Sequence, residues 1–347
     1  MRVLMLTRYQ PLSAASRLRF YQYLPFLELH GVEVTPAPLL TDADLARLYS
    51  TGRRGLVSTF SAYLKRAAQL FGRYDLLWIE KELFPMLPAL AEYLLRTPYV
   101  VDYDDAVFHN YDLHRSAFVR RALSGKIDAV MRRAALVVAG NAYLATRARL
   151  AGAQWVEVLP TVIDITRYTL AAPPPPPITI GWIGSPSTSK YVEMLAPLLQ
   201  ELCAGGQARL LTIGAKNLRL PPAIPHENRD WAEEREVRDI QAMHIGIMPL
   251  PDEPWERGKC GYKLIQYMAC GLPVVASAVG VNIELAADNG FAADSADEWR
   301  EALFRLRDDA ALRAQWGAAG RRKIEAGYTL QVSAPRLLDL LRHAAQQ

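Results

Sequence analysis

The sequence predicts an α/β protein of two domains, each with a parallel sheet covered by helices. Short apolar runs alternate with longer helical patterns along the chain, which is typical of stacked βα units. The length of 347 residues suits two domains. Five consecutive prolines, Pro173–Pro177, interrupt the pattern, and a new βα series begins directly after them. A proline run lacks free N–H groups and favours extended geometry, so we interpret it as a stiff spacer between the domains.

The expected strands are short and apolar. In the first half they are Arg2–Thr7, Glu33–Pro36, Leu76–Glu80, Tyr99–Tyr103, Leu136–Ala139 and Val156–Leu159; in the second half they are Ile178–Gly184, Arg209–Ile213, Ile245–Met248 and Pro273–Ala276. The expected helices are Ser16–His30, Leu83–Leu95, Arg115–Arg133, Ser189–Leu202 and Tyr262–Ala269, with a helical C-terminal end. We therefore expect one domain over 1–170, a second over 171–325, and a final helix over 326–347 that packs back on the first domain.

Charge is distributed unevenly between the two halves. Residues 1–170 carry 21 Lys/Arg against 15 Asp/Glu, a net charge of +6, whereas the remainder carries 19 against 21, a net charge of −2. The basic half could face an anionic partner such as a bilayer or a phosphate-bearing acceptor, or simply carry a solvated surface. The apolar runs are too short to span a membrane. Three scattered cysteines predict reduced thiols in a cytoplasmic protein, which could lie peripherally at the inner membrane face.

The segment from 246 to 290 carries the strongest chemical signal. A strand runs into a charged loop, a helix over Tyr262–Ala269 follows, and a buried strand then leads to a turn of small residues ending at Gly280. Glycines permit close backbone approach, and helix N-termini attract anions. Three cations, Arg257, Lys259 and Lys263, lie in the loop and the first helical turn. This arrangement predicts a diphosphate site, although a loop of solvent-exposed cations is the alternative.

This segment resembles the donor-binding signature of the retaining glycosyltransferase family 4, whose members have the GT-B fold. The matching positions are Gly261, Met268, Ala269, Gly271, Pro273, Val274, Val275, Ala276, Ser277, Gly280 and Glu284. The resemblance extends to ITIGWIGSPSTSK, in which Lys190 is implied to reach the donor phosphates, and to VLPTVIDITRY, which ends near Asp164 and Tyr168. It implies two Rossmann-like domains with parallel sheets facing across a cleft.

The resemblance implies a donor site in the second domain. The donor-binding candidates are Gly184, Ser185, Glu256, Arg257, Lys259, Gly261, Gln266, Gly280, Asn282, Ile283 and Glu284. Two glutamates that the family places eight positions apart are absent, because Gly258 and Gln266 occupy their positions. Gln266 keeps hydrogen-bonding ability without charge, and Glu256 could substitute for the first glutamate.

The first domain is expected to hold the acceptor. Asp102, Asp104 and Asp105 lie at the end of a strand. The resemblance places Asp104 near the family's active-site histidine position, while a D-x-D metal site and a simple loop of surface aspartates are alternatives. Further acceptor-binding candidates are Ser16, Arg17, Asp105 and His109. The basic segment 115–134 favours either a helix resting on a membrane or a packed helix with a solvated face.

The implied activity is transfer of a sugar from a nucleotide-sugar to an acceptor hydroxyl with retention, in surface polysaccharide or glycan biosynthesis. The catalytic candidates are Asp104, Lys190 and Lys263, with the lysines replacing a metal ion at the departing diphosphate. No resident cofactor, metal or nucleic-acid partner is expected; the nucleotide, UDP or GDP, stays open, as does a glycan or lipid-linked acceptor. The alternatives are a catalytically silent nucleotide-sugar-binding scaffold and a nucleotide-sugar epimerase. A dehydrogenase is disfavoured because no G-x-G-x-x-G follows the first strand.

Overall fold

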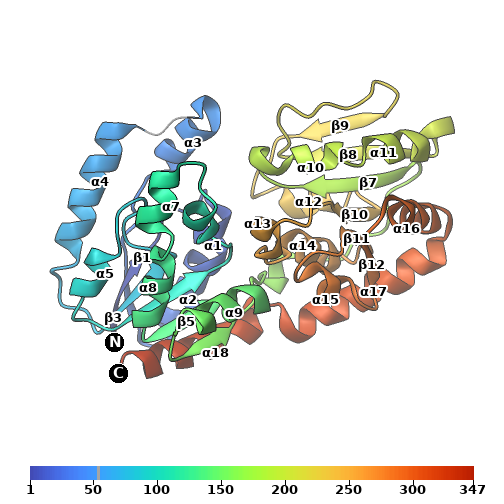
Figure 1. Cartoon of the computed structure of the whole chain (residues 1–347). Helices are drawn as coiled ribbons and strands as arrows, with labels where there is room; N and C mark the ends of the chain where they lie inside the picture. Colours follow the sequence, from blue (N-terminus) through green and yellow to red (C-terminus); the bar gives the residue numbers. More distant parts are fainter. Residues whose placement is uncertain (53–54) are drawn as a thin grey trace. The chain divides into compact units, whose positions relative to one another are not determined.

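The computed structural model describes residues 1–52 and 55–347. The chain forms two compact units (Figure 1). Unit 1 comprises Met1–Thr161, Gly258–Cys260 and Leu330–Gln347, and unit 2 comprises Val162–Arg257 and Gly261–Thr329. Each unit contains a six-stranded parallel sheet, so the predicted α/β class with two parallel-sheet domains is confirmed.

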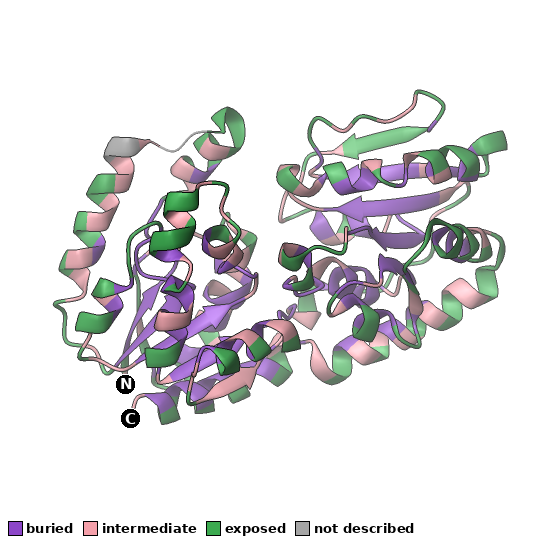
Figure 2. Ribbon diagram, in the orientation of Figure 1, coloured by how far each residue is buried: buried purple, intermediate pink, exposed green. Residues whose placement is uncertain are grey.

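The sheet of unit 1 has the order β2-β1-β3-β4-β5-β6. Its strands are β1 (Arg2–Leu6), β2 (Glu33–Pro36), β3 (Leu76–Glu80), β4 (Tyr99–Tyr103), β5 (Leu136–Ala139) and β6 (Val156–Val158). Its helices are α1 (Ala14–Arg19), α2 (Leu24–Leu29), α3 (Asp42–Thr51), α4 (Leu56–Gln69), α5 (Leu90–Leu94), α6 (His109–Asp112), α7 (Ala117–Leu123), α8 (Lys126–Arg133), α9 (Ala142–Leu150) and α18 (Leu330–Ala344). Strands β3, β4 and β5 are buried throughout (Figure 2), which explains their continuous apolar sequences.

The sheet of unit 2 has the order β12-β11-β10-β7-β8-β9. Its strands are β7 (Ile178–Ile183), β8 (Ala208–Ile213), β9 (His226–Arg229), β10 (Ile245–Met248), β11 (Val274–Ser277) and β12 (Gly290–Ala293). Its helices are α10 (Lys190–Glu193), α11 (Ala196–Leu202), α12 (Glu236–Ile240), α13 (Pro254–Arg257), α14 (Tyr262–Ala269), α15 (Asn282–Ala286), α16 (Ala296–Asp308) and α17 (Ala310–Gly327). Successive residues of β11 point to opposite faces of the sheet. Val275 belongs to one apolar cluster, whereas Val274 and Ala276 belong to the other.

Four predicted helices are shorter or broken; one of them, Ser189–Leu202, divides into α10 and α11 at Met194 and Leu195. The pattern over Ser16–His30 forms α1, a 3₁₀ turn and α2, with a proline in the first turn of α2. The segment Leu83–Leu95 is helical only over α5, and Arg115–Arg133 divides into α7 and α8 at Ser124 and Gly125. The spacing of apolar residues in these segments indicates which side chains are buried. It does not indicate where the backbone departs from helical geometry.

The proline run is not a spacer between the units. Pro173–Pro177 lies within unit 2, because residues from Val162 onward already belong to that unit. Ile163 and Tyr168 are buried in its apolar core, and the backbone carbonyl of Pro174 lies 2.9 Å from Nε2 of His244. The chain therefore enters unit 2 before the proline run, and the extended prolines follow its surface to β7. The first segment of unit 1 ends at Thr161 rather than at 170.

His244 links the proline segment to the sheet, and we expect it to make the stability of unit 2 pH-dependent. Its Nδ1 accepts a hydrogen bond from the backbone N–H of Thr179 at 3.0 Å, so Nε2 carries the proton that Pro174 accepts. Burial lowers the pKa of His244 below 6.5, because the charged imidazolium loses hydration. His244 therefore takes up a second ring proton more readily in the unfolded chain than in the folded protein. Stability conferred by neutral His244 is complete above about pH 6.5 and lost as pH falls.

Thermal unfolding between about pH 5 and 8 measures this effect. The parent protein should lose melting temperature on acidification more steeply than His244→Gln. His226, whose pKa burial also lowers, titrates equally in both proteins and supplies the background slope. Parallel profiles for the two proteins would contradict the assignment.

Candidate functional site

The carboxyl edge of the unit 2 sheet is lined by glycines. Gly184 follows β7, and a Cβ placed there would lie 2.5 Å from Cζ2 of Trp182 and 2.8 Å from Cε of Lys263. A Cβ at Gly214, after β8, would lie 2.4 Å from the Gly184 carbonyl oxygen. Any larger residue would displace these neighbours. The two glycines therefore keep the backbone of neighbouring loops and the stem of Lys263 close together.

Helix α14 carries a cation in its first turn, next to this edge. Gly261 precedes the helix with φ of 65°, a left-handed conformation that glycine adopts without strain. Lys263 is the second residue of α14 and is half-buried, with Nζ 5.5 Å from the centre of the Trp182 ring. A positive side chain in the first turn of a helix creates a site suited to phosphate oxygens.

A second cation lies on α10, which follows the loop after β7. Lys190 is exposed at the first position of α10, and its Nζ is 5.3 Å from the ring centre of Tyr191. The Tyr191 hydroxyl donates to Oε1 of Glu256, which is buried on α13, whereas Oε2 of Glu256 has no hydrogen-bond partner among residues 1–52 and 55–347. A buried, unsatisfied carboxylate oxygen is costly and often indicates a ligand contact. Ser185 hydrogen-bonds Ser187 at 3.0 Å within the same loop.

The turn after β11 forms a further part of this edge. Gly280 has φ of 56°, and a Cβ there would lie 2.6 Å from the Arg257 carbonyl oxygen. The side-chain amide of Asn282 is buried and donates to the Ser277 carbonyl at 3.2 Å. Asn282 therefore supports the turn. Ile283 and Glu284, which follow it on α15, are exposed.

Two of the predicted donor residues are engaged inside unit 2. Arg257 forms a bidentate ion pair with Asp252, at 2.6 and 2.9 Å, and both side chains are about half exposed. Gln266 is buried, and its amide donates to the Tyr168 hydroxyl at 3.4 Å. Tyr168 in turn donates to Glu236 at 2.7 Å. The amide that replaces the family's glutamate thus belongs to an internal hydrogen-bond network.

The segment Gly258–Cys260 folds with unit 1, although the residues on either side of it belong to unit 2. The Asn141 side-chain amide donates to the carbonyls of Gly258 and Lys259, at 2.9 and 3.0 Å. A Cβ at Gly258 would lie 2.5 Å from Cβ and 2.8 Å from the backbone N of Ala106. A glutamate would not fit this position without moving the backbone, which gives a physical reason for its absence.

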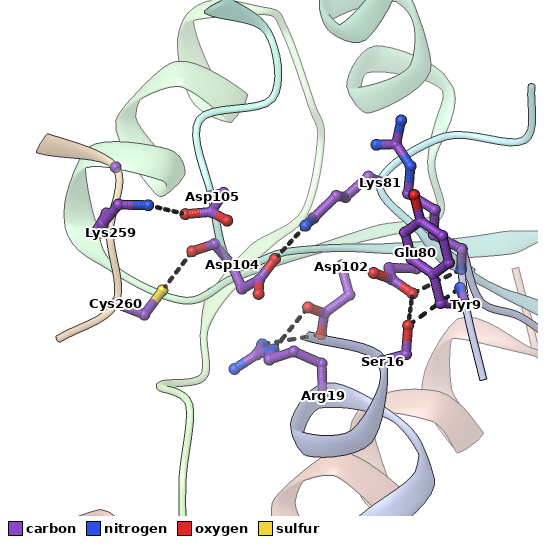
Figure 3. Close-up of polar contacts among 12 residues, drawn as sticks. Tyr9, Ser16, Arg19, Glu80, Lys81, Asp102, Asp104, Asp105, Lys259 and Cys260 are labelled. Carbon is purple, nitrogen blue, oxygen red and sulfur yellow. Dashed lines mark hydrogen bonds and ion pairs between the residues drawn. The ribbon is translucent and has the colours of Figure 1, made fainter. Parts of the chain in front are cut away.

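Lys259 therefore belongs to unit 1 and not to unit 2, to which the sequence assigned it. Its Nζ pairs with Asp105 at 3.2 Å, and the buried thiol of Cys260 donates to the Asp104 carbonyl at 3.0 Å (Figure 3). Burial, with the nearby carboxylates of Asp104 and Asp105, raises the pKa of Cys260 to about 12, so this thiol is protonated and unreactive at neutral pH.

The carboxyl edge of the unit 1 sheet carries an ion pair between Asp104 and Lys81, a buried residue that the sequence analysis missed. Lys81 follows β3, Asp104 follows β4, and Nζ of Lys81 lies 2.8 Å from Oδ1 of Asp104 (Figure 3). Lys81 has φ of 66°, which is uncommon for a residue with a side chain. Such strain is often found at functional sites. The position of Lys81 immediately after a predicted strand was the signal that could have identified it.

The two partners shift each other's ionisation. Burial favours neutral Lys81, but the carboxylates of Asp104, Asp105 and Glu80 outweigh it, and the pKa of Lys81 is raised. Burial also favours neutral Asp104, but the ammonium of Lys81, assisted by Arg19, outweighs it, and the pKa of Asp104 is lowered. Both groups are therefore charged at neutral pH, with Asp104 partly accessible to solvent.

Two further carboxylates at this edge have structural partners. Glu80 accepts hydrogen bonds from the Ser16 hydroxyl and the Arg8 backbone, both at 2.7 Å (Figure 3). Ser16 is buried, so this predicted acceptor residue fixes the first βα loop to β3. Asp102 lies within β4 rather than after it and forms a buried bidentate pair with Arg19, at 2.8 and 2.9 Å.

The remaining acceptor candidates also have partners within unit 1. Arg17 donates from Nη1 to the Pro11 carbonyl at 2.8 Å. His109 places Nδ1 2.8 Å from Asp112 and Nε2 2.9 Å from the Tyr143 hydroxyl. These side chains stabilise the local loops, and the structure does not gather them around Asp104.

The D-x-D alternative finds no support at this edge. Asp102 and Asp104 each pair with a cation, and across residues 1–52 and 55–347 no group of three His, Cys, Asp or Glu side chains is placed to hold a metal ion. Within the same ranges, no helix has the length and apolar character that crossing a membrane requires. Cys203, Cys260 and Cys270 are buried free thiols.

Comparisons with known proteins agree with this geometry. Residues 177–309 match the family model for glycosyl transferases group 1. A curated relative, the GDP-mannose-dependent monoacylated alpha-(1-6)-phosphatidylinositol monomannoside mannosyltransferase of Corynebacterium glutamicum, is 26% identical over 212 residues, which cover 54% of this chain. The match spans 56% of that protein's length.

Solved structures resemble almost the whole chain. Sucrose-phosphate synthase from Thermosynechococcus elongatus has a TM-score of 0.74 at 16% identity, with 99% of this chain and 98% of that chain covered. A glycosyltransferase from Rickettsia africae has a TM-score of 0.71 at 12% identity, covering 100% and 99%. HepE from Anabaena in complex with UDP has a TM-score of 0.67 at 17% identity, covering 99% and 100%.

The two parallel-sheet units, each with polar groups at its carboxyl edge, are those of the GT-B class of proteins. Residues 177–309 match the group 1 glycosyltransferase family, and the chain as a whole shares its fold with glycosyltransferases of known structure.

Proposed function

We propose that this chain transfers a sugar from a nucleotide-sugar donor to an acceptor hydroxyl, with retention of anomeric configuration and without a metal ion. The observation that carries the proposal is the carboxyl edge of unit 2, where Gly184 allows close approach of backbone and Lys263 occupies the first turn of α14. Lys190 and the unsatisfied oxygen of Glu256 add a second cation and a hydrogen-bond acceptor.

The names of the similar proteins support a nucleotide-sugar as donor. The curated relative is named for its dependence on GDP-mannose, and the HepE structures include complexes with UDP and with UDP-glucose. The same names leave the nucleotide of this chain open between GDP and UDP. The acceptor named for the curated relative is a phosphatidylinositol mannoside, which favours a glycan or lipid-linked acceptor and a role in glycan or surface polysaccharide biosynthesis. The buried free cysteines are compatible with a cytoplasmic location.

In the proposed reaction, the bond between the anomeric carbon and the diphosphate oxygen breaks, and the acceptor oxygen bonds to the same face of that carbon. The diphosphate leaves with the bonding electron pair, and the acceptor proton passes to a phosphate oxygen. Lys190 and Lys263 stabilise the departing charge. The free oxygen of Glu256 would accept a hydrogen bond from a donor hydroxyl, and Asp104 would orient the acceptor hydroxyl while Lys81 keeps it ionised.

Nucleotide binding provides the first test. We expect GDP or UDP to raise the melting temperature of the folded protein in excess chelator, because a ligand that binds only the native state stabilises it. The matching sugar conjugate should do the same, and the other nucleotide and ADP should shift the melting temperature less. A shift that appears only when a divalent cation is supplied would contradict metal-independent binding, and no shift with any nucleotide would contradict the donor site.

Product analysis distinguishes the two alternatives. A silent scaffold is motivated by Gly258 and by the buried Gln266, which replace the family's glutamates. Such a scaffold would bind the nucleotide-sugar but would neither transfer the sugar nor hydrolyse the donor, even slowly. An epimerase would convert the donor sugar without any acceptor. A glycosyltransferase would release nucleoside diphosphate faster when acceptor is present.

A further inference from the structure

Helices α4 and α5 share an outward-facing apolar surface on unit 1. Both helices bind the same segment, Leu83–Pro85: the Tyr63 hydroxyl of α4 donates to the Pro85 carbonyl at 2.6 Å, and Glu92 of α5 accepts from the Leu83 N–H at 3.0 Å. They consequently lie beside each other on one flank of unit 1 (Figure 1). Arg66 of α4 and Glu92 of α5 are buried against this segment, so the opposite sides of the two helices face solvent.

Those solvent-facing sides carry large apolar residues at helical spacing. Phe60 and Leu64 lie one turn apart on α4, Phe71 continues the same stripe just beyond its end, and Leu90 and Leu94 lie one turn apart on α5. Phe71 is 89% exposed, Leu94 73% and Phe60 67%. Two adjacent apolar stripes of this kind are unusual on a soluble surface and indicate an interaction site.

Within segment 55–98, which contains these stripes, most of the exposed charged residues are positive. The exposed charged residues of segment 55–98 are Lys65, Arg73, Asp75 and Arg96. The other acids of that segment, Glu80, Glu82 and Glu92, are buried. Arg133 of α8 adds a further exposed cation, since its guanidinium lies 4.4 Å from the ring centre of Tyr93 on α5.

We propose that this surface, the α4–α5 surface, binds peripherally to an anionic lipid bilayer. It comprises Phe60, Leu64, Phe71, Leu90, Tyr93 and Leu94, with the cations Lys65, Arg73, Arg96 and Arg133. Aromatic and aliphatic side chains enter the boundary between headgroups and acyl chains, while lysines and arginines bind anionic headgroups. Asp75, the exposed acid of segment 55–98, accepts a hydrogen bond from the Arg2 backbone.

The α4–α5 surface differs from the segment that charge alone singled out in the sequence. In α7, Phe118 is 80% exposed beside Arg120 and Arg121, but this short helix presents one large apolar residue rather than a stripe. The inference is also independent of the glycosyl-transfer proposal, because none of its residues lies at the carboxyl edge of either sheet.

Vesicle co-sedimentation of the full chain tests the proposal. The protein should bind vesicles of phosphatidylcholine mixed with phosphatidylglycerol, with little binding to phosphatidylcholine alone, and salt should weaken the binding. Phe71→Ser/Leu94→Ser should lower the partition coefficient roughly tenfold or more, since the burial of two large side chains is lost. Lys65→Glu/Arg73→Glu should lower it similarly at low salt. Leu150→Ser, at the equally exposed end of α9, is the matched control and should bind like the parent.

Three results would overturn the proposal. The first is the absence of binding to anionic vesicles, and the second is binding that the α4–α5 variants and Leu150→Ser alter to the same extent. The third comes from sedimentation velocity: a dimer that forms with rising concentration and disappears in Phe71→Ser/Leu94→Ser would assign the surface to a second copy of the chain. Circular dichroism of each variant verifies that it is folded, and these exposed substitutions should leave the fold intact.

Discussion

Lys190→Ala and Lys263→Ala are each expected to turn over at least about a hundredfold more slowly than the parent protein, because each removes a positive charge from the departing diphosphate. Lys263 should have the larger effect. It is half-buried beside Trp182 and Gly184, where a charge acts with less solvent screening than it does at exposed Lys190. The measurement is the initial rate of nucleoside diphosphate release at saturating donor and acceptor.

Three further variants make this result specific. Lys263→Arg retains the charge and should recover part of the rate. Arg322→Ala removes an exposed cation from α17 in the same unit and should leave kcat within about twofold of the parent, as surface substitutions usually do. Gly184→Val should behave like Lys263→Ala, because its side chain would occupy the space of Cε of Lys263. If Lys190→Ala and Lys263→Ala both turned over normally with unchanged melting temperatures, neither lysine would act on the leaving group.

Lys81→Met is expected to lower activity. It should also move the loss of activity at acidic pH to a higher pH than in the parent protein. In the parent, Lys81 and Arg19 hold the pKa of Asp104 below its usual value against the opposing effect of burial. Without the Lys81 ammonium, burial has the larger effect on the pKa of Asp104, so Asp104 takes up a proton at a higher pH. Protonated Asp104 can no longer accept a hydrogen bond from the hydroxyl of the sugar acceptor as a carboxylate does. The other ionisable groups facing this site, Arg19, Glu80, Asp102, Asp105, Lys259 and Cys260, stay in place.

The pH profile of kcat/KM for the acceptor, between about pH 4 and 8, measures the shift. Lys81→Arg keeps the positive charge and should restore a profile like that of the parent. Asp104→Asn should be slow at every pH, because it removes the titrating group. Donor binding, measured by the melting-temperature shift with nucleotide, should survive in Lys81→Met. Parent-like profiles in that variant would show that Lys81 does not control Asp104.

The sequence predicted the sheets better than the helices. Buried parallel strands are short, continuous apolar runs, and β2, β3, β4, β5 and β10 lie where that pattern placed them. Where a helix begins and ends depends on tertiary contacts, and the spacing of apolar residues does not indicate these contacts. Leu83 to Ala89 is apolar, yet it stays non-helical while Arg66 and Glu92 bind its backbone at Leu83. The proline run suggested a boundary because composition changes there, but buried Ile163 and Tyr168 place the preceding segment in unit 2.

Candidate site residues in helices, or directly after a strand, were easier to infer than those in the long charged loop before α14. Lys263 and Gly184 follow from the strand–loop–helix pattern, and both lie at the carboxyl edge of unit 2. Lys259 was assigned by its neighbours in sequence to the donor loop, whereas its backbone is held by Asn141 and its charge by Asp105. Neither partner is near in sequence. Tyr191 had no sequence signal, because its importance comes only from the contact with Glu256.

The return of residues 258–260 to unit 1 limits how this chain can be recombined. A chimaera that joins unit 2 of one family member to unit 1 of another at the junctions near 161 and 330 would still transplant Gly258, Lys259 and Cys260 with the wrong half. Asn141, Ala106 and Asp105 of the host would then meet a foreign tripeptide, and any side chain larger than that of glycine at position 258 would strike Ala106. An exchange of unit 2 therefore requires residues 258–260 to be kept from the host protein, although they lie within the exchanged stretch of sequence.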